Sequence, residues 1–204
     1  MISDAAARLF RMQTTTLDLE PQATEVARVV TAVRHDQLTD PTPCTGTSVA
    51  ALLDHLVGLT LGFRLGAEKV PQHGAPRADA DQLAADWRDR LPGQLDALVT
   101  AWREPAAWEG VTVVGGAELP AAAMGVVVAN EVLVHGWDLA VATGQPYRAD
   151  PATAEACLAF VAGVPAEMRS SMFGPIVPVA GDAPVLDRLL GLTGRDPGWA
   201  AAHS

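Results

Sequence analysis

The sequence predicts an all-α protein, a bundle of four or five helices with one or two short extended pieces. Proline and glycine divide the 204 residues into segments of helical length. Within these segments apolar residues recur at helical spacing, and in the segment 120–143 they cover most of the helix surface. No repeat or long linker interrupts the pattern, so we treat residues 1–204 as a single domain.

The composition indicates a folded protein with one sizeable core. The chain is 49% hydrophobic and 19% charged, which is unlike a disordered chain, and a domain of this length buries roughly 70% of its unfolded surface. The net charge of −10 disfavours nucleic acid and anionic membranes as partners, because such a surface repels phosphates. We expect a monomer or homodimer that acts on small molecules.

The N-terminus and the apolar runs predict a cytoplasmic protein. Asp4 and Arg8 interrupt the stretch that a signal peptide would keep apolar, and the longest apolar run, 119–129, is shorter than the ~20 residues of a membrane span. Cys44 and Cys157 form no CxxC pair, so we expect both to be reduced. Cys157 is interpreted as a small core residue, while Cys44 lies just before a candidate site helix.

The first two helices are predicted from valine and leucine spacing. A helix opens near Pro21 and ends near His35, and the segment 40–46 is too rich in proline and glycine to be helical. Ser48 then offers an N-cap for a second helix. The apolar stripe of this second helix is formed by Val49, Leu52, Leu53, Leu56, Val57 and Leu59.

The third helical region runs over 81–102 and contains Pro92, which predicts a kink or a break there. The segment 108–114 alternates valine and threonine before Gly115 and Gly116, which is typical of one short strand or one arm of a hairpin.

The most apolar helix is predicted from Pro120 to about Thr143, with Gly144 after its end. A further helix starts after Pro151 and runs towards Met168. The segment 173–178 is too rich in proline to be helical, and a short helix follows from 182 or 183 through 190.

A carboxylate and an imidazole lie on one face of the central helix. Glu131 and His135 are four residues apart, so their side chains are neighbours inside the predicted core. A buried Glu131 must be protonated, paired with a cation or bound to a metal. No lysine or arginine lies between Gly110 and Tyr147. On spacing alone two interpretations remain open, an intrahelical hydrogen-bonded pair and two metal ligands.

A third ligand is expected from another helix, and elimination points to His55. It is the only other histidine inside an apolar helical pattern, whereas His35 ends a helix, His73 lies in a loop and His203 in the tail. Asp138, three residues after His135, is placed to accept a hydrogen bond from an imidazole.

Five short runs resemble the actinobacterial DinB-like metal-binding proteins, which are related to the N-terminal domain of mycothiol-dependent maleylpyruvate isomerase. These runs are PTPCTG at 41–46, LLDHLVG at 52–58, EVLVHGWDLA at 131–140, FGP at 173–175 and LDRLLG at 186–191. The resemblance covers nearly the whole chain. It implies a DinB-like four-helix bundle with short additional helices that holds a divalent metal through His55, Glu131 and His135.

The resemblance also implies metal activation of a low-molecular-weight thiol such as mycothiol. Three protein ligands leave a coordination position open, and two neutral imidazoles with one carboxylate give the site a formal charge of +1, which favours an anionic thiolate there. We therefore expect an enzyme, a metal-dependent thiol S-transferase or thiol-assisted isomerase, with the thiol and an electrophilic substrate as its small-molecule partners.

Two other functions and two other metals stay open. The same open position would serve a hydrolase that uses bound hydroxide, and a fourth protein ligand such as Cys44 would instead favour a non-catalytic binding or stress protein. Zinc is the expected ion. Nickel is an alternative, and iron is another, since two histidines and one carboxylate also form the iron site of nonhaem oxygenases.

Overall fold

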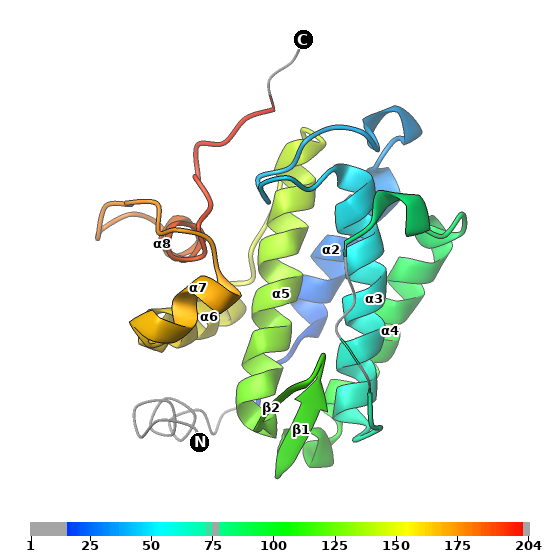
Figure 1. Cartoon of the computed structure of the whole chain (residues 1–204), viewed down its shortest axis with the longest axis vertical. Coiled ribbons are helices and arrows are strands. Elements are labelled where there is room, and N and C mark those ends of the chain that lie inside the picture. The colour runs from blue at the N-terminus through cyan, green and yellow to red at the C-terminus, as the bar shows by residue number, and fades with distance from the viewer. Residues whose placement is uncertain (1–15, 73, 75–77, 202–204) are drawn as a thin grey trace.

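The computed structural model describes residues 16–72, 74 and 78–201, and these residues form seven α-helices and one two-stranded sheet (Figure 1). The predicted all-α class is confirmed. Four residues used in the sequence analysis lie outside the described ranges: Asp4, Arg8, His73 and His203.

Four helices form the bundle: α2 (Glu20–Ala32), α3 (Val49–Ala67), α4 (Trp87–Arg103) and α5 (Ala121–Ala142). Contacts join α2 to α4, α4 to α3, α3 to α5 and α5 back to α2, so the four helices close a ring around one core. Most residues of α5 are buried, as its apolar surface on nearly all sides predicts. A polar side chain on α5 therefore needs a partner inside the protein.

Three shorter helices, α6 (Pro151–Gly163), α7 (Ala166–Met172) and α8 (Val185–Leu192), pack beside the bundle. Helix α6 contacts both α5 and α8, and Figure 1 shows this group to the left of α5. The predicted single helix from 151 towards 168 is wrong, because it is divided in two. Pro165 forces the residue before it, Val164, into an extended conformation (φ −65, ψ 123), which ends α6.

A short hairpin joins α4 and α5, as the valine and threonine alternation predicts. Strands β1 (Val111–Val114) and β2 (Ala117–Pro120) pair antiparallel. Gly115 and Gly116 have φ values of 58° and 84°, which glycine adopts without strain and which a two-residue hairpin turn requires. The Thr112 hydroxyl donates to the carbonyl of Gly66 (2.6 Å), so β1 is attached to the end of α3.

Several predicted helix ends agree with the structure and others shift. The Ser48 hydroxyl accepts the Ala51 N–H (3.3 Å), which confirms the N-cap of α3. Helix α2 ends at Ala32, earlier than predicted, because the chain turns extended at Val33 (ψ 129). The third region breaks before Trp87 and not at Pro92, so the break predicted at this proline is wrong, and α4 continues past it.

Helices α3 and α5 are long and apolar enough to cross a membrane when judged by length and composition alone, with mean hydropathies of 1.4 and 1.3. Within the protein, 83% of this window in α5 and 50% in α3 is buried. The core thus accounts for the apolar character of α5.

Gly125 of α5 lies against the indole of Trp108, and a Cβ added there would meet the ring at 2.2 Å. The ring has little room to move, because its Nε1 donates to the Trp102 carbonyl (2.6 Å). We predict that Gly125→Ala destabilises the protein by about 1–3 kcal/mol. As a matched control, Gly93→Ala in α4 meets nothing within 4 Å and should stabilise by about 0.5–1 kcal/mol. Thermal unfolding of both variants checks the opposite signs, and equal melting temperatures would contradict the close packing of Gly125 and Trp108.

Candidate metal centre

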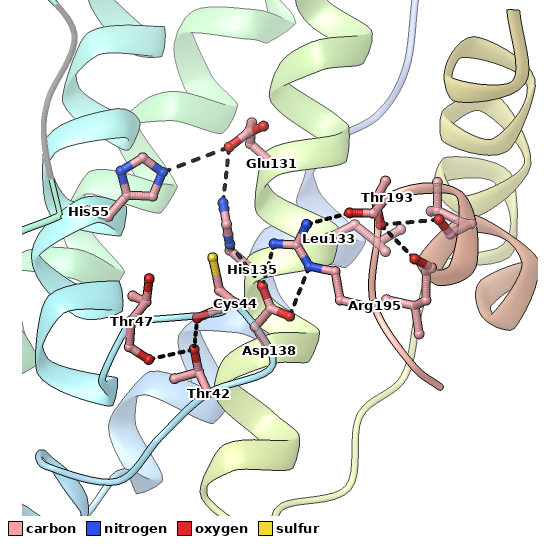
Figure 2. Close-up of polar contacts among 12 residues, drawn as sticks. Thr42, Cys44, Thr47, His55, Glu131, Leu133, His135, Asp138, Thr193 and Arg195 are labelled. Carbon is pink, nitrogen blue, oxygen red and sulfur yellow. Dashed lines mark hydrogen bonds and ion pairs between the residues drawn. The ribbon is translucent and has the colours of Figure 1, made fainter. Parts of the chain in front are cut away.

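Three predicted ligand side chains from two helices point at one another (Figure 2). His55 comes from α3, and Glu131 and His135 come from successive turns of α5. Glu131 Oε2 lies 3.2 Å from His135 Nε2 and 3.9 Å from His55 Nε2. One ligand atom from each residue lies within 4.8 Å of the other two. The structure therefore brings together the helix pair predicted from spacing and the histidine predicted by elimination.

The donor set fits a divalent metal ion. Zinc binds imidazole nitrogen and carboxylate oxygen at about 2.0–2.2 Å, which in tetrahedral geometry places the ligand atoms roughly 3.4 Å apart. The distances from Glu131 Oε2 to the two Nε2 atoms, 3.2 and 3.9 Å, lie on either side of this value. The two imidazole rings meet edge to face, with centroids 5.1 Å apart and an interplanar angle of 85°, so their Nε2 atoms approach Glu131 from different directions. An ion between them requires only small side-chain movements.

Asp138 orients the ring of His135. Its Oδ2 lies 3.0 Å from His135 Nδ1, and the Asp138 side chain is fully buried. When Nδ1–H donates to this carboxylate, Nε2 is the ring nitrogen that faces Glu131 and can bind a metal. The contact predicted from the spacing of these two residues is present in the structure. The Nδ1 atom of His55, in contrast, is buried and has no partner among the described residues.

Arg195 is the member of the centre that sequence reasoning missed. Its Nη2 donates to Asp138 Oδ2 (2.9 Å) and its Nε to Oδ1 (3.3 Å), and its Nη1 donates to the Thr193 carbonyl (2.9 Å). The side chain is only 12% exposed. A buried aspartate on an apolar helix signals the need for a cation, but the sequence does not say which arginine supplies it.

The centre favours positive charge between its two carboxylates. Burial opposes the charged imidazole, yet hydrogen bonds with Asp138 and Glu131 outweigh burial and raise the pKa of His135 to about 10. Burial would likewise raise the pKa of Glu131, but its hydrogen bonds with His135 and His55 dominate and lower it. In the chain without metal, a proton on His135 therefore supplies the cation that these carboxylates require.

The two cysteines lie in different environments. Cys44 is partly exposed, and its sulfur lies within 4.8 Å of ligand atoms of His135 and Asp138, on the side of the ring away from Glu131 (Figure 2). Cys157 is fully buried in the core, as predicted, and burial raises the pKa of its thiol. Of the other histidines, His35 lies exposed in the turn η1 (His35–Gln37).

A hollow of about 390 Å³ opens beside the three candidate ligands. We call this space the polar hollow, because polar side chains border much of it on the side of Cys44 and Arg195. The volume is within the range of about 300–1,000 Å³ that small-molecule sites occupy. A ligand in this polar hollow would reach the side of the centre that the three protein ligands leave open.

Comparison with known proteins identifies a family and two relatives of the chain. The family model described as the mycothiol maleylpyruvate isomerase N-terminal domain matches residues 19–140. Two uncharacterized proteins of Mycobacterium tuberculosis, from strains CDC 1551 / Oshkosh and ATCC 25618 / H37Rv, are each 31% identical over 169 residues, covering 78% of this chain and 81% of theirs. No solved structure matches the chain significantly. The matched span includes α2 to α4, most of α5 and all three candidate ligands, and the chain belongs to the mycothiol maleylpyruvate isomerase N-terminal domain family.

Proposed function

We propose that the chain binds one divalent ion, zinc in preference to nickel or iron, through His55, Glu131 and His135. The observation that carries this proposal is the convergence of two imidazole nitrogens and one carboxylate oxygen within 4.8 Å beside an open hollow. Two neutral nitrogens and one carboxylate are ordinary zinc ligands, and three of them leave a coordination position for a small molecule. The hydrogen bond from His135 to Asp138 supports the proposal, because metal-binding histidines are commonly held in this way.

The small molecule proposed for the open position is a thiol, with mycothiol as the first choice. The family name supports this choice, and the polar hollow offers uncharged and cationic groups to a polar thiol. The bound ion would lower the pKa of the thiol so that the nucleophilic thiolate forms at neutral pH. The activity proposed is transfer of this sulfur to an electrophile, as a thiol S-transferase or thiol-assisted isomerase. A cytoplasmic location fits a thiol that must stay reduced.

The residues of the chain hold and orient the reacting groups. Asp138 keeps Nδ1 of His135 protonated, and Arg195 balances the charge of that carboxylate, so the ring stays aimed at the centre. Cys44 groups with His135 and Asp138 rather than with His55 and Glu131, which supports an open position over a fourth protein ligand. The arrangement therefore favours catalysis over simple sequestration of a metal.

We predict close to one divalent ion per chain in protein made without a metal-binding tag. His55→Ala or His135→Ala should remove most of it, because two ligands hold zinc much more weakly than three. His35→Ala is the matched control, since His35 lies exposed in η1 and should leave the content unchanged. Elemental analysis measures the ratio. A wild-type content near zero that persists after zinc is supplied would show that the proposal is wrong.

We predict that Asp138→Asn lowers zinc affinity by about 10- to 100-fold, because an amide holds the His135 tautomer less firmly. The control is Asp54→Asn, which alters the carboxylate next to His55 in the sequence. Asp54 accepts the Asp79 N–H (3.1 Å) and is not bonded to a candidate ligand. Competition with a chromophoric chelator measures both affinities, and an equal loss in the two variants would contradict the positioning role of Asp138.

We predict that mycothiol binds the zinc-loaded protein with release of a proton, at a pH where the free thiol is protonated. Calorimetry in two buffers of different ionisation enthalpy counts the proton. Cys44→Ser should keep both binding and proton release, since the added thiol supplies the sulfur. Binding without proton release would argue against thiolate formation, and the absence of binding to metal-loaded protein would overturn the assignment of a thiol cosubstrate.

A further inference from the structure

A second hollow, of about 440 Å³, adjoins the other side of the candidate centre. It lies among α3, the hairpin β1–β2, α5 and the segment around Phe173, and Figure 1 shows this hairpin at the lower end of α5. His55, Asn130 and Glu131 border both hollows. The apolar members of its wall are Leu59, Phe63, Val114, Ala117, Leu119, Met124, Val127, Phe160, Met172 and Phe173.

The wall of this hollow carries almost no charge. Among the residues described, its only ionisable side chains are His55 and Glu131, and with the proposed ion and a bound thiolate the centre carries no net charge. The wall contains no lysine or arginine, again within the described part of the chain, so a carboxylate or phosphate on a ligand would lose its water without gaining a partner. We call this space the apolar hollow. Its chemistry selects against anionic ligands.

Asn130 gives the apolar hollow one uncharged hydrogen-bonding group beside the centre. The residue is only 4% exposed, and its Oδ1 is buried and has no partner in the described structure. A buried amide oxygen without a partner is destabilising. Asn130 itself borders both hollows, so its side chain is an uncharged polar group at their shared edge.

We propose that the apolar hollow binds the electrophilic substrate, and that this substrate is an uncharged molecule with a mainly apolar body. The inference rests on the proposed function, in which the polar hollow receives the thiol. The two reactants then meet at the edge shared by both hollows, next to His55 and Glu131. The thiolate sulfur supplies the electron pair of the new bond to carbon, and the leaving group departs with the pair of the broken bond and takes up the proton that the thiol released.

The test uses N-phenyl-1-naphthylamine, a neutral fluorescent probe, in titrations of metal-free and zinc-loaded protein. Wild type should bind one probe in both forms. Ala117→Trp, which fills the apolar hollow from an exposed position on β2, should weaken binding at least ten-fold. Ala159→Trp is the matched control, because Ala159 is an exposed alanine bordering a different hollow between α6 and α8. It should change the affinity less than two-fold.

A charged relative of the probe tests the selection against anions. 8-Anilino-1-naphthalenesulfonate has the same rings with one sulfonate, and it should bind metal-free protein at least ten-fold more weakly. Equal or tighter binding of the sulfonate, or loss of N-phenyl-1-naphthylamine binding in Ala159→Trp instead of Ala117→Trp, would overturn the inference. Circular dichroism of both variants verifies that the tryptophans leave the fold intact.

The titrations separate this inference from the proposed function. Protein that takes up zinc and binds mycothiol but not the neutral probe keeps the proposed function and loses the apolar site. If the protein binds the probe but takes up no metal, the apolar binding site is supported. Its occupant is then not the electrophile of a metal-dependent reaction. Cobalt loaded in place of zinc should broaden the proton resonances of bound probe, and unbroadened resonances would contradict the shared edge of the two hollows.

Discussion

The compensation of charge along one face of α5 is the constraint around which the molecule is organised. Glu131, His135 and Asp138 follow one another on the most buried helix, where an unpaired charge is far costlier than at the surface. The carboxylate of Glu131 contacts the ring of His135, and this ring contacts Asp138. Asp138 in turn pairs with Arg195, so each charge has a partner of opposite sign. Helix α3 must therefore approach closely enough to bring His55 to the first carboxylate, and the segment after α8 must bring Arg195 to the second.

The contacts in this group of charged residues that depend only on helix geometry could be predicted from the sequence. A spacing of four and a spacing of three place Glu131, His135 and Asp138 together on any helix, whatever surrounds it. His55 followed by elimination, because it is the one other histidine within an apolar helical pattern. The hairpin was equally local, since its two glycines meet the turn requirement by themselves.

Contacts and surfaces that depend on tertiary packing could not be predicted from the sequence. Arg195 lies in an irregular segment with no periodicity, so nothing in its own neighbourhood assigns it to Asp138. The helix predicted towards Met168 was wrong for a different reason, because the effect of Pro165 on the residue before it is local and can be predicted from the sequence. The two hollows arise from side chains of at least four separate elements, and no pattern within one element describes such a surface.

The residues that the family model matches and the residues that border the candidate centre are not the same set. The matched span ends at residue 140, whereas Met172 and Phe173 border both hollows and Arg195 borders the polar one. The bundle thus supplies the candidate ligands, and the region that follows it supplies part of the wall that a substrate would touch. Relatives that keep the bundle and vary this region would keep the centre and change what it recognises.

The ion pair of Asp138 with Arg195 spans 57 residues of chain, and this separation has a consequence for biogenesis. Synthesis proceeds from the N-terminus, so α2 to α5 leave the ribosome while Arg195 has not yet been made. During that interval the nascent bundle carries a buried aspartate without its guanidinium, and the His135 ring lacks its full support. A bundle that folds in this interval would complete its centre only when Arg195 reaches Asp138, and an ion taken up earlier would be held by a looser site than the one in the finished molecule.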